Sequence, residues 1–400
     1  MKLLKLSYQD VHAEWGFDDL SFFPDVSLLV GASGVGKTRI LRAIWCLRQI
    51  ANDSNSGSFW GVSWNTQFHD VEGRVYFWSG NFSRRDGLEG VASGDDDENP
   101  TADLFDGLEP KKPRLEHEIL MCDGKPVFER WGDKFQLAGQ DCLPAKLSPN
   151  ETGFIILSEE DAVKPARLAI SQMLYVDPGE DLDEPYRIYS PHGSISRHAK
   201  RYCNLKDIRD CRLPTHMKLA LIYEHERDEF NDIVNGFKDV FPYIEDIKIE
   251  RTNFGPFADV PVIQMKERGL PKYFSQDVLS SGMRRTLMHL ARIALWPDGT
   301  LVLIDEFENS LGANCIDAVA QELIGIGKRL QFIITSHHPY IINALPMDRW
   351  KVIGRKQGRI ENYTTSQLGI GASKHEAFLQ LINTDVFKFG ILPNEPVLSR

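Results

Sequence analysis

The sequence has few cysteines and no long hydrophobic run. Its 400 residues include 6 cysteines and no Cys-x-x-Cys pair, which excludes the disulfide framework of a small secreted protein. His192, His198, Cys203 and Cys211 share one region, but their spacing fits no common zinc pattern. No run of about 18 apolar residues is present, and the N-terminus MKLLKLSYQDV turns polar too early for a signal peptide. We therefore expect a cytoplasmic protein with no membrane partner.

An excess of positive charge is also missing. The chain has 46 Lys and Arg against 57 Asp and Glu, a net charge of -11. A surface coated with basic residues for nucleic acid is therefore not expected. The net charge does not exclude a local basic groove. Internal repeats and sustained heptads are absent too, which argues against a long coiled-coil arm. The 42% hydrophobic and 10% aromatic residues that are present suffice for a large core.

A complete phosphate-loop motif, GASGVGKT, occupies residues 31–38. It follows the apolar run VSLLV and precedes an amphipathic helix expected over residues 38–50. The glycines let consecutive backbone N–H groups curl around a phosphate chain, and the helix N-terminus adds its positive dipole end. We expect Lys37 to contact the β- and γ-phosphates and Thr38 to bind Mg²⁺. The further candidate nucleotide-binding residues of this segment are Gly31, Ser33, Gly34, Gly36 and Arg39.

Two acidic residues end a second apolar run, TLVLIDE at residues 300–306. Adjacent carboxylates at the end of a buried strand are costly unless they hold a metal ion or a water molecule. We interpret Asp305 as an outer ligand of Mg²⁺ and Glu306 as the catalytic base that polarises the attacking water. The two motifs together predict ATP and Mg²⁺ as substrate and cofactor.

Two further segments carry candidate phosphate contacts. LSSGM at residues 279–283 precedes a helix with one apolar face, and Ser280, Ser281 and Gly282 offer a second phosphate cradle. Taken alone, such a segment is usually only a helix cap. FIITSHHP at residues 332–339 is an apolar strand that ends in two histidines.

The order of these motifs resembles that of ABC-type ATPases: phosphate loop, signature, acid pair, switch histidine. The commonest signature is LSGGQ, and here Ser281 replaces its first glycine and Met283 its glutamine. The resemblance implies an ATP-sandwich homodimer in which the signature serine of one copy completes the site of the other. It also implies His337 as a catalytic γ-phosphate contact, with His338 as second choice. Residues 308–311 (ENSL) would then contact the other copy across the dimer.

One element of the family pattern has no clear match. ABC heads usually carry a glutamine loop that reaches Mg²⁺ from the lid subdomain. Here a strand expected over residues 154–157 leads into Ser-Glu-Glu at residues 158–160, while Gln136 and Gln140 lie upstream. We leave this position unassigned.

The length of the segment between Lys37 and Ser281 distinguishes the subfamilies of ABC-type ATPases. It is too long for a transport ATPase and lacks the coiled coil of structural-maintenance and Rad50-type proteins. Its length, the SSG signature and the run TSHHPYIINAL resemble stand-alone ATPases related to the overcoming-lysogenisation-defect (OLD) nucleases. GASGVGKTRIL looks like the ATPase subunits of anti-phage systems, in particular the phage anti-restriction-induced system (PARIS).

That resemblance implies an ATP-driven sensor and scaffold in anti-phage defence. OLD nucleases continue into a Toprim domain with a D-x-D pair, which the tail after His337 lacks. A toxic effector nuclease would therefore be a separate chain. The implied partners are further copies of this chain, as a dimer or a higher oligomer such as a hexamer, the effector, and a phage-encoded trigger protein.

The motifs predict an α/β fold, an ABC-type P-loop head with a mixed or parallel sheet flanked by helices. We expect residues 1–85 and 270–400 to form this head. Residues 86–269 would form a helical and β insertion for the lid and for oligomerisation, with an exposed acidic loop at residues 86–113. The finer predictions are helices over 160–175, 215–240 and 374–382, strands over 244–251 and 260–267, and a hairpin over 351–363.

Two other functions stay open. A DNA-repair ATPase of the RecF or Rad50-like type would bind DNA in an ATP- and salt-dependent way. The basic residues available for it lie at 197–212 and at Arg284 and Arg285. A transport ATPase would instead require a membrane partner.

Overall fold

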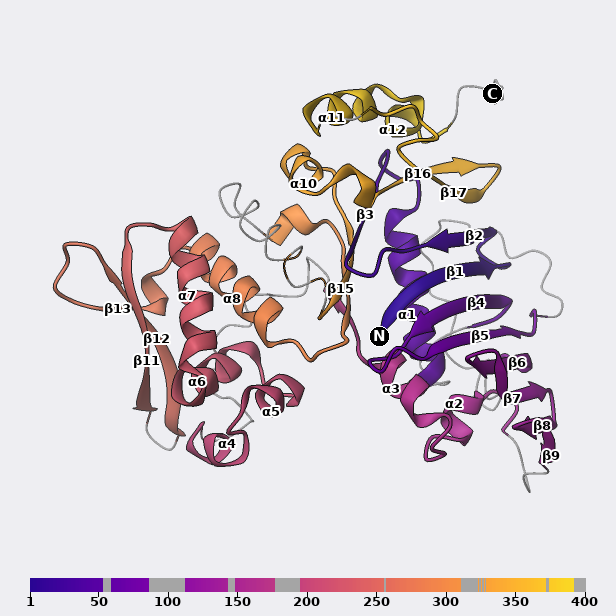
Figure 1. The fold of residues 1–400 in the computed structure, drawn as a ribbon, viewed down its shortest axis with the longest axis horizontal. Helices are drawn as coiled ribbons and strands as arrows, with labels where there is room; N and C mark the ends of the chain where they lie inside the picture. The colour runs from indigo at the N-terminus through magenta and orange to yellow at the C-terminus, as the bar shows by residue number, and fades with distance from the viewer. Residues whose placement is uncertain are drawn as a thin grey trace, which may run out of the picture.

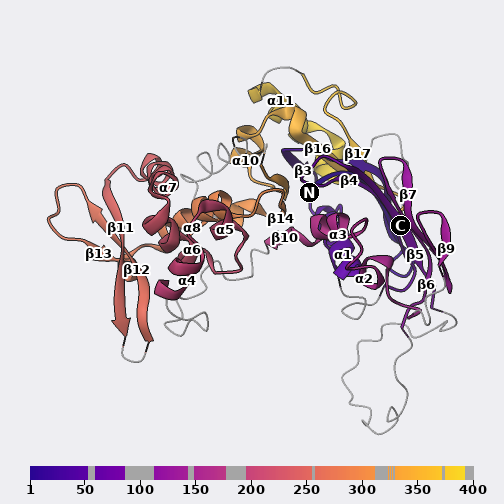
Figure 2. The same ribbon diagram turned by 60° about the horizontal axis from the view of Figure 1, so that its bottom comes forward.

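The computed structural model describes most of the chain as two lobes (Figures 1 and 2). The described residues are 1–52, 59–85, 112–142, 148–176, 195–254, 257–310, 329–371 and 374–391, together with Leu323, Gly325 and Gly327. The larger lobe is built on a 14-stranded sheet and the smaller on a three-stranded sheet. Most of the expected acidic loop, residues 86–111, lies outside the described part.

The parallel section of the large sheet has the strand order β10-β14-β15-β3-β16. Its strands are β3 (Val26–Val30), β10 (Met173–Val176), β14 (Leu301–Ile304), β15 (Gln331–Thr335) and β16 (Trp350–Lys356). Every residue of β3, β14 and β15 is buried, as expected for parallel strands covered on both faces. The strand order places the end of β15 between the phosphate-loop strand and the strand that leads to the acid pair.

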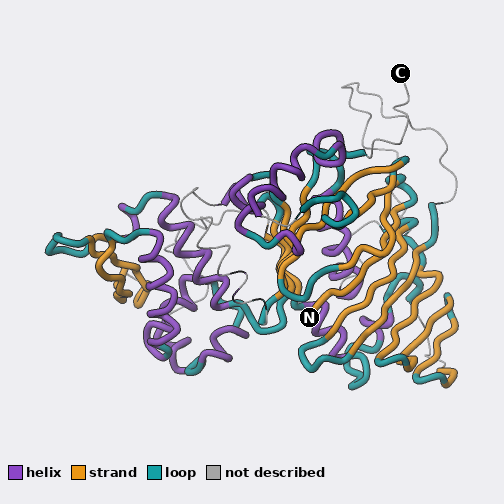
Figure 3. The backbone as a smooth tube through the Cα atoms, turned by 45° about the horizontal axis from the view of Figure 1, so that its top comes forward, coloured by secondary structure: helices purple, strands orange, loops and turns teal. Residues whose placement is uncertain are grey.

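An antiparallel section extends the sheet on the other side of β16. Its order is β17-β2-β1-β4-β5-β6-β7-β8-β9, and all neighbours are antiparallel except β17 and β2. The bounds are β1 (Lys2–Asp10), β2 (Trp15–Ser21), β4 (Val62–His69), β5 (Val75–Phe82), β6 (Leu115–Cys122), β7 (Lys125–Trp131), β8 (Lys134–Leu137), β9 (Gln140–Cys142) and β17 (Arg359–Tyr363). Figure 3 shows the strands as one continuous curved layer. The predicted hairpin over 351–363 is confirmed as β16 and β17.

Helix α1 (Lys37–Asn52) covers one face of the sheet with α2 (Gly153–Ile156) and α3 (Lys164–Ser171). Its residues Ile40, Leu41, Ile44, Leu47 and Ile50 are buried at helical spacing, as the sequence predicts. Leu29 of β3 points into this core, whereas Leu28 and Val30 point into the core on the opposite face. The parallel strands are therefore buried between two separate apolar clusters.

The opposite face of the sheet contacts the C-terminal helices and the smaller lobe. Helices α10 (Pro339–Ala344), α11 (Lys374–Asn383) and α12 (Asp385–Phe389) cover it near β16 (Figure 1). The smaller lobe consists of α4 (Ile195–Arg201), α5 (Leu205–Asp210), α6 (Thr215–His225), α7 (Arg227–Val240), β11 (Ile244–Phe254), β12 (Phe257–Glu267), β13 (Phe274–Ser275) and α8 (Ser281–Leu295). Short 3-10 turns lie at Gln276–Val278, Phe307–Ser310 and Met347–Arg349.

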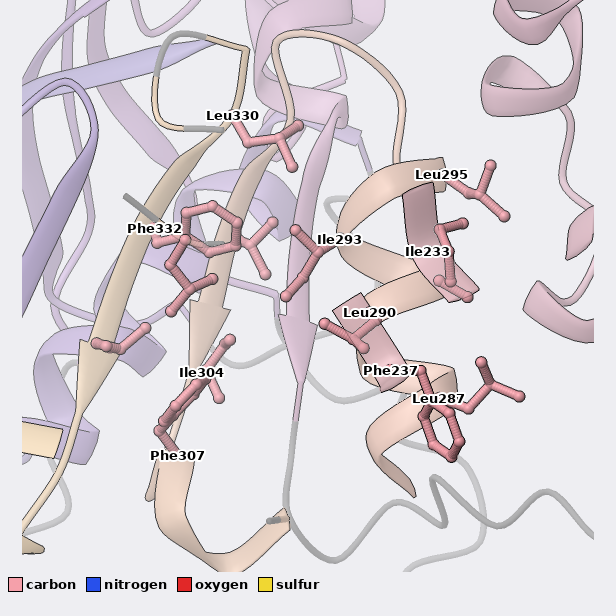
Figure 4. Packing of buried hydrophobic residues seen from close by; sticks show 14 of the residues in the cluster. Ile233, Phe237, Leu287, Leu290, Ile293, Leu295, Ile304, Phe307, Leu330 and Phe332 are labelled. Atoms are coloured by element: carbon pink, nitrogen blue, oxygen red, sulfur yellow. The ribbon is translucent and has the colours of Figure 1, made fainter. Parts of the chain in front are cut away.

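Helix α8 joins the two lobes through apolar contacts. Figure 4 shows Leu287 and Leu290 of α8 beside Phe237 of α7, with Ile293 directed toward the sheet residues Ile304 and Phe332. All six side chains are buried. The helix that follows the serine-glycine segment is therefore part of a core shared by both lobes.

Three sequence predictions are wrong in detail. Residues 154–157 were expected as a strand but lie mainly in α2, because Phe154 packs edge-on against Trp78 and Phe128 beneath the antiparallel strands. The single helix expected over 215–240 is interrupted at Glu226, whose φ of -133° and ψ of 65° are not helical. Residues 160–175 divide into α3 and the start of β10.

The large sheet also continues beyond the boundary that we expected for the insertion. We expected residues 86–269 to form it, yet β6 to β10 are strands of the same sheet as β1 to β5. Strand β6 pairs with β5 and strand β10 pairs with β14, so residues 115–176 extend the head. The described segment that folds around a separate sheet runs from α4 to α8, which places the start of the insertion later in the chain.

Candidate functional site

The loop between β3 and α1 has a backbone that requires glycine. Gly31, Gly34 and Gly36 have φ values of 151°, 77° and 113°, a range that other residues rarely adopt. A Cβ atom on Gly31 would lie 2.4 Å from the carbonyl oxygen of Ile353, and one on Gly36 would lie 2.6 Å from Cδ1 of Ile360. The hairpin β16–β17 therefore lies so close to the loop that a side chain at Gly31 or Gly36 would contact it.

Lys37 is held inside this loop. Its side chain is buried, and its ammonium group donates hydrogen bonds of 2.9 Å to the carbonyl oxygens of Gly31 and Ala32. Burial lowers the pKa of Lys37 to about 8, although Asp305 and Glu306 act in the opposite direction. The lysine is thus pre-positioned over the loop by neutral acceptors, which an anionic phosphate would outcompete.

The acid pair follows β14, and Asp305 contacts Thr38 of α1 and Thr335 of the neighbouring strand β15. Oδ1 of Asp305 accepts hydrogen bonds from the hydroxyls of Thr38 at 3.2 Å and Thr335 at 2.6 Å. The hydroxyl of Thr335 also accepts a hydrogen bond of 2.8 Å from the backbone N–H of Glu306. Thr335 was missed by the sequence reasoning, although its place just before the histidine pair was a usable signal. It ties the acid pair to the strand that leads to His337.

Glu306 has an unusual backbone conformation. Its φ of 46° lies in the left-handed region, which a glutamate seldom occupies. Such conformations cost energy and concentrate at functional sites. Glu306 adopts this conformation directly after Asp305, two residues beyond the end of β14.

The two histidines have different surroundings. His337 lines the cavity above the phosphate loop, and its backbone N–H donates to Oε1 of Glu308 at 2.7 Å. Burial, and secondarily the charge of Lys37, lower the pKa of His337, which favours the neutral imidazole. His338 instead caps α10, where its Nδ1 accepts from the N–H of Tyr340 at 3.4 Å. Of our two candidates, His337 is the one that faces the cavity.

The cavity itself has a volume of about 320 Å³ and gathers most of the predicted site residues. Its lining consists of Ser33, Gly34, Gly36, Lys37, Thr38, Arg39, Asp305, Glu306, Thr335, His337 and Arg355. Arg355, at the end of β16, was not predicted because no motif surrounds it. Its Nε is buried and has no hydrogen-bond partner within the described part of the chain. Arg355 is thus a further cation of the cavity lining, in addition to Lys37 and Arg39.

The signature segment is in the other lobe. Ser280 caps α8, with its hydroxyl accepting from the N–H of Met283 at 3.2 Å, and nothing lies within 4 Å of a Cβ atom placed on Gly282. The described residues that line the cavity include none from this segment. The side chain of Ser281 is not among those described. One copy of the chain therefore leaves the signature open and apart from the phosphate loop.

Other predicted positions add nothing to the cavity. Gln136 and Gln140 lie in β8 and β9, at the edge of the sheet farthest from β14, so the glutamine-loop position stays unassigned. The side chains of Asn309 and Ser310 and all of Leu311 fall outside the described residues. Within the described part, no three His, Cys, Asp or Glu side chains form a cluster suited to a metal ion. The helices described there include none long and apolar enough to cross a membrane.

The lowered pKa of Lys37 leads to a pH prediction for nucleotide affinity. Below about pH 8 the lysine is protonated before binding, so affinity should not depend on its titration. Above that pH the free protein loses the proton, whereas bound phosphate charge raises the pKa again. Affinity should therefore fall by up to about tenfold per pH unit above 8, since phosphate groups are already ionised there. Calorimetry with ATP at pH 7, 8 and 9 tests this, and constant affinity across the series would contradict it.

One family model matches part of the chain. Residues 168–343 match the family described as "AAA domain, putative AbiEii toxin, Type IV TA system". A search of curated proteins returned no match. Among solved structures, the chain is similar to an Smc head bound to the C-winged helix domain of ScpA, with 12% identity, a TM-score of 0.44 and coverage of 91% of this chain and 98% of that one.

Two further structures show a comparable likeness. The SMC head domain from Thermotoga maritima has 12% identity and a TM-score of 0.42, covering 91% of this chain and 99% of that one. An Smc head from Pyrococcus furiosus, with an extended coiled coil and bound to the C-terminal domain of ScpA, has 13% identity and a TM-score of 0.41. It covers 92% of this chain and 97% of that one.

Proposed function

We propose that this chain binds and hydrolyses ATP with Mg²⁺, and that a second copy completes each site. One observation carries the proposal: Lys37, Thr38, Asp305, Glu306 and His337 come from segments far apart in sequence and line one cavity at the ends of parallel strands. Phosphate loop, acid pair and histidine together are what phosphoryl transfer from ATP requires.

The residues fit the substrate and the metal ion. The loop N–H groups and Lys37 would bind the phosphates, a role supported by the glycine conformations and by the burial of the lysine. Thr38 and Asp305, already joined by a hydrogen bond, offer the oxygen ligands that Mg²⁺ prefers. When bound, Mg²⁺ neutralises phosphate charge. Glu306 would then accept a proton from water, and His337 would donate a hydrogen bond to the γ-phosphate.

The same proposal accounts for the position of the signature. Ser280 and Gly282 begin α8 in the smaller lobe, where Gly282 has open space around it. A helix N-terminus is a good phosphate ligand, and the described lining of the nucleotide cavity includes no residue of this one. A second copy related by two-fold symmetry would bring each signature to the other phosphate loop.

We further propose that ATP-dependent pairing controls a toxic effector, a separate nuclease, in anti-phage defence. Support comes from the OLD-like motif layout and from the family match, whose description names a toxin of a type IV TA system. This chain would act as the sensor and scaffold, and ATP hydrolysis would reset it.

A complementation experiment tests the composite site. Gly282→Asp should place a negative charge against the phosphates of the opposite copy, without a clash inside its own chain. Gly282→Asp and Lys37→Ala should each lack ATPase activity. In a 1:1 mixture, half the dimers are mixed and each has one intact site, so about a quarter of the wild-type rate should return.

The control is Asn235→Asp, which adds one negative charge at an exposed position of α7 in the same lobe. It should keep the wild-type rate. No recovery in the mixture, with both variants folded, would exclude a site shared between copies. Wild-type turnover of Gly282→Asp alone would show that the signature is not part of the site.

A further inference from the structure

A second cavity, larger than the nucleotide cavity, lies between the two lobes. Its volume is about 950 Å³. The larger lobe contributes residues of α1, α3 and β10 to its wall, and the smaller lobe contributes residues of α5, α6 and α8. Figure 2 shows α5 and α8 on the side of the smaller lobe that faces the large sheet. Of the basic residues noted in the sequence, Arg212 and Arg284 line this cavity.

The wall of this interlobe cavity is strongly basic. Arg48, Arg212, Lys218, Arg284 and Arg292 line it, and Asp210 is the one acidic residue among the described lining residues. The whole chain has the opposite balance, with a net charge of -11. Composition alone therefore does not produce this concentration of positive charge, and bringing cations together costs energy unless an anion offsets it.

Two of the cations are held by neutral groups. Lys218 is buried, and its ammonium donates to the carbonyl oxygens of Arg209 at 2.6 Å and Leu295 at 3.4 Å. Burial lowers its pKa. The Nε of Arg48 donates to the carbonyl oxygen of Ser171 at 3.1 Å, while its guanidinium lies over the ring of Trp45.

Arg284 supplies the most direct indication of a missing ligand. Its Nε is buried and has no hydrogen-bond partner among the described residues. A buried donor left unpaired costs about 1–3 kcal/mol, and more when the group is charged. An acceptor bound in the cavity would remove this cost.

We infer that the interlobe cavity binds a small phosphate-bearing molecule of nucleotide size. Its volume is in the range of small-molecule sites, and arginine side chains suit the planar, multiple hydrogen bonds that phosphate accepts. Leu174, Met288 and Trp296 add apolar wall for an organic part. The site is separate from the nucleotide cavity, since the two share no lining residue.

The ligand would contact both helices that carry nucleotide motifs. Arg48 belongs to α1, which begins at Lys37, and Arg284, Met288 and Arg292 lie four residues apart on one face of α8. A bound anion would therefore join the phosphate-loop helix to the signature helix. Regulation of turnover by this ligand rests on the proposed ATPase function, whereas binding to the cavity does not.

Binding is tested with inorganic tripolyphosphate and the full-length Lys37→Ala variant, in which the phosphate loop no longer competes. Calorimetry should show one remaining site. Adding Arg284→Gln and Arg292→Gln to this variant should weaken that site at least about tenfold, because two charged hydrogen-bond donors are lost.

Adding Arg212→Gln to Lys37→Ala, at an exposed position that cannot disturb the fold, should also weaken tripolyphosphate binding. Lys134→Gln with Lys272→Gln, both exposed and outside the cavity, is the matched loss of two charges and should change nothing.

The outcomes separate the alternatives. No tripolyphosphate binding to folded Lys37→Ala, or equal binding after the cavity arginines are replaced, would overturn the inference. A 20-nucleotide oligothymidylate serves as the second probe. If it alone binds, with a steep dependence on salt, the cavity is part of a nucleic-acid surface and the small-molecule assignment fails. If tripolyphosphate binds the cavity but wild-type protein shows no ATPase activity, the inference stands and the proposed function does not.

Discussion

Replacement of Lys37 by alanine is expected to reduce nucleotide affinity by about 100- to 10,000-fold and to abolish ATPase activity. The ammonium group would make at least two charge-assisted hydrogen bonds to phosphate, each contributing about 1.5–3 kcal/mol. The other cations of the described cavity lining are Arg39, one position beyond Thr38 in α1, and Arg355 of β16, and neither belongs to the phosphate loop. Titration with a fluorescent ATP analogue measures the loss.

The fold of the variant must be checked, because Lys37 is buried and bonds to Gly31 and Ala32. Thermal unfolding without nucleotide should stay close to the wild-type curve, since the two carbonyl groups can accept hydrogen bonds from water. Lys134→Ala, at an exposed lysine of β8, provides the control for loss of one positive charge. A folded Lys37→Ala that retains wild-type affinity would mean that the phosphate loop does not bind the nucleotide.

Local motifs made the centre of this site predictable. The backbone conformations of Gly31, Gly34 and Gly36 follow from eight consecutive residues, so the cradle around Lys37 can be read without knowledge of the rest of the fold. Asp305 could be predicted because an apolar run that ends in two acids has few other uses. In each case the residues that suggest the function, the phosphate loop or the acid pair, lie in one short segment of the sequence.

Residues whose role depends on distant segments were not predictable in the same way. Thr335 bonds to Asp305 only because β15 lies between β3 and β14, an order that no local pattern encodes. Arg355 reaches the cavity because β16 pairs with β3 on its other side. The misassigned segment 154–157 is similar: its apolar residues fit a strand or a helix, and contacts with Trp78 and Phe128 decide between them.

The extent of the sheet shows the same limit. The sequence between the phosphate loop and the signature is interrupted at residues 86–113 by an acidic, glycine- and proline-containing stretch, which looked like a domain boundary. Strand pairing nevertheless continues across it, from β5 to β6. Composition predicts that residues 86–113 are exposed. It does not predict that the strands before and after them pair with each other in one sheet.

Replacement of Glu306 by glutamine should separate ATP binding from hydrolysis. Glutamine keeps the size of the side chain and the backbone N–H that bonds to Thr335, so the turn at φ 46° should persist. The amide cannot accept a proton from water, and loss of a general base typically costs about 100- to 10,000-fold in rate. Turnover should therefore fall by at least about 100-fold while ATP affinity stays near the wild-type value. Single-turnover hydrolysis and equilibrium titration measure the two quantities separately.

The oligomeric state of Glu306→Gln in ATP tests whether two copies share the nucleotide site. If a second copy completes the site, unhydrolysed ATP should hold two copies together, and Glu306→Gln should elute as a larger species in ATP than in ADP. Glu159→Gln, at an exposed glutamate outside the cavity, should behave as wild type. Wild-type turnover of Glu306→Gln would refute its role as the base. Slow turnover with no change in size would keep that role and reject the shared site, because a catalytic defect within one chain gives ATP no reason to join two.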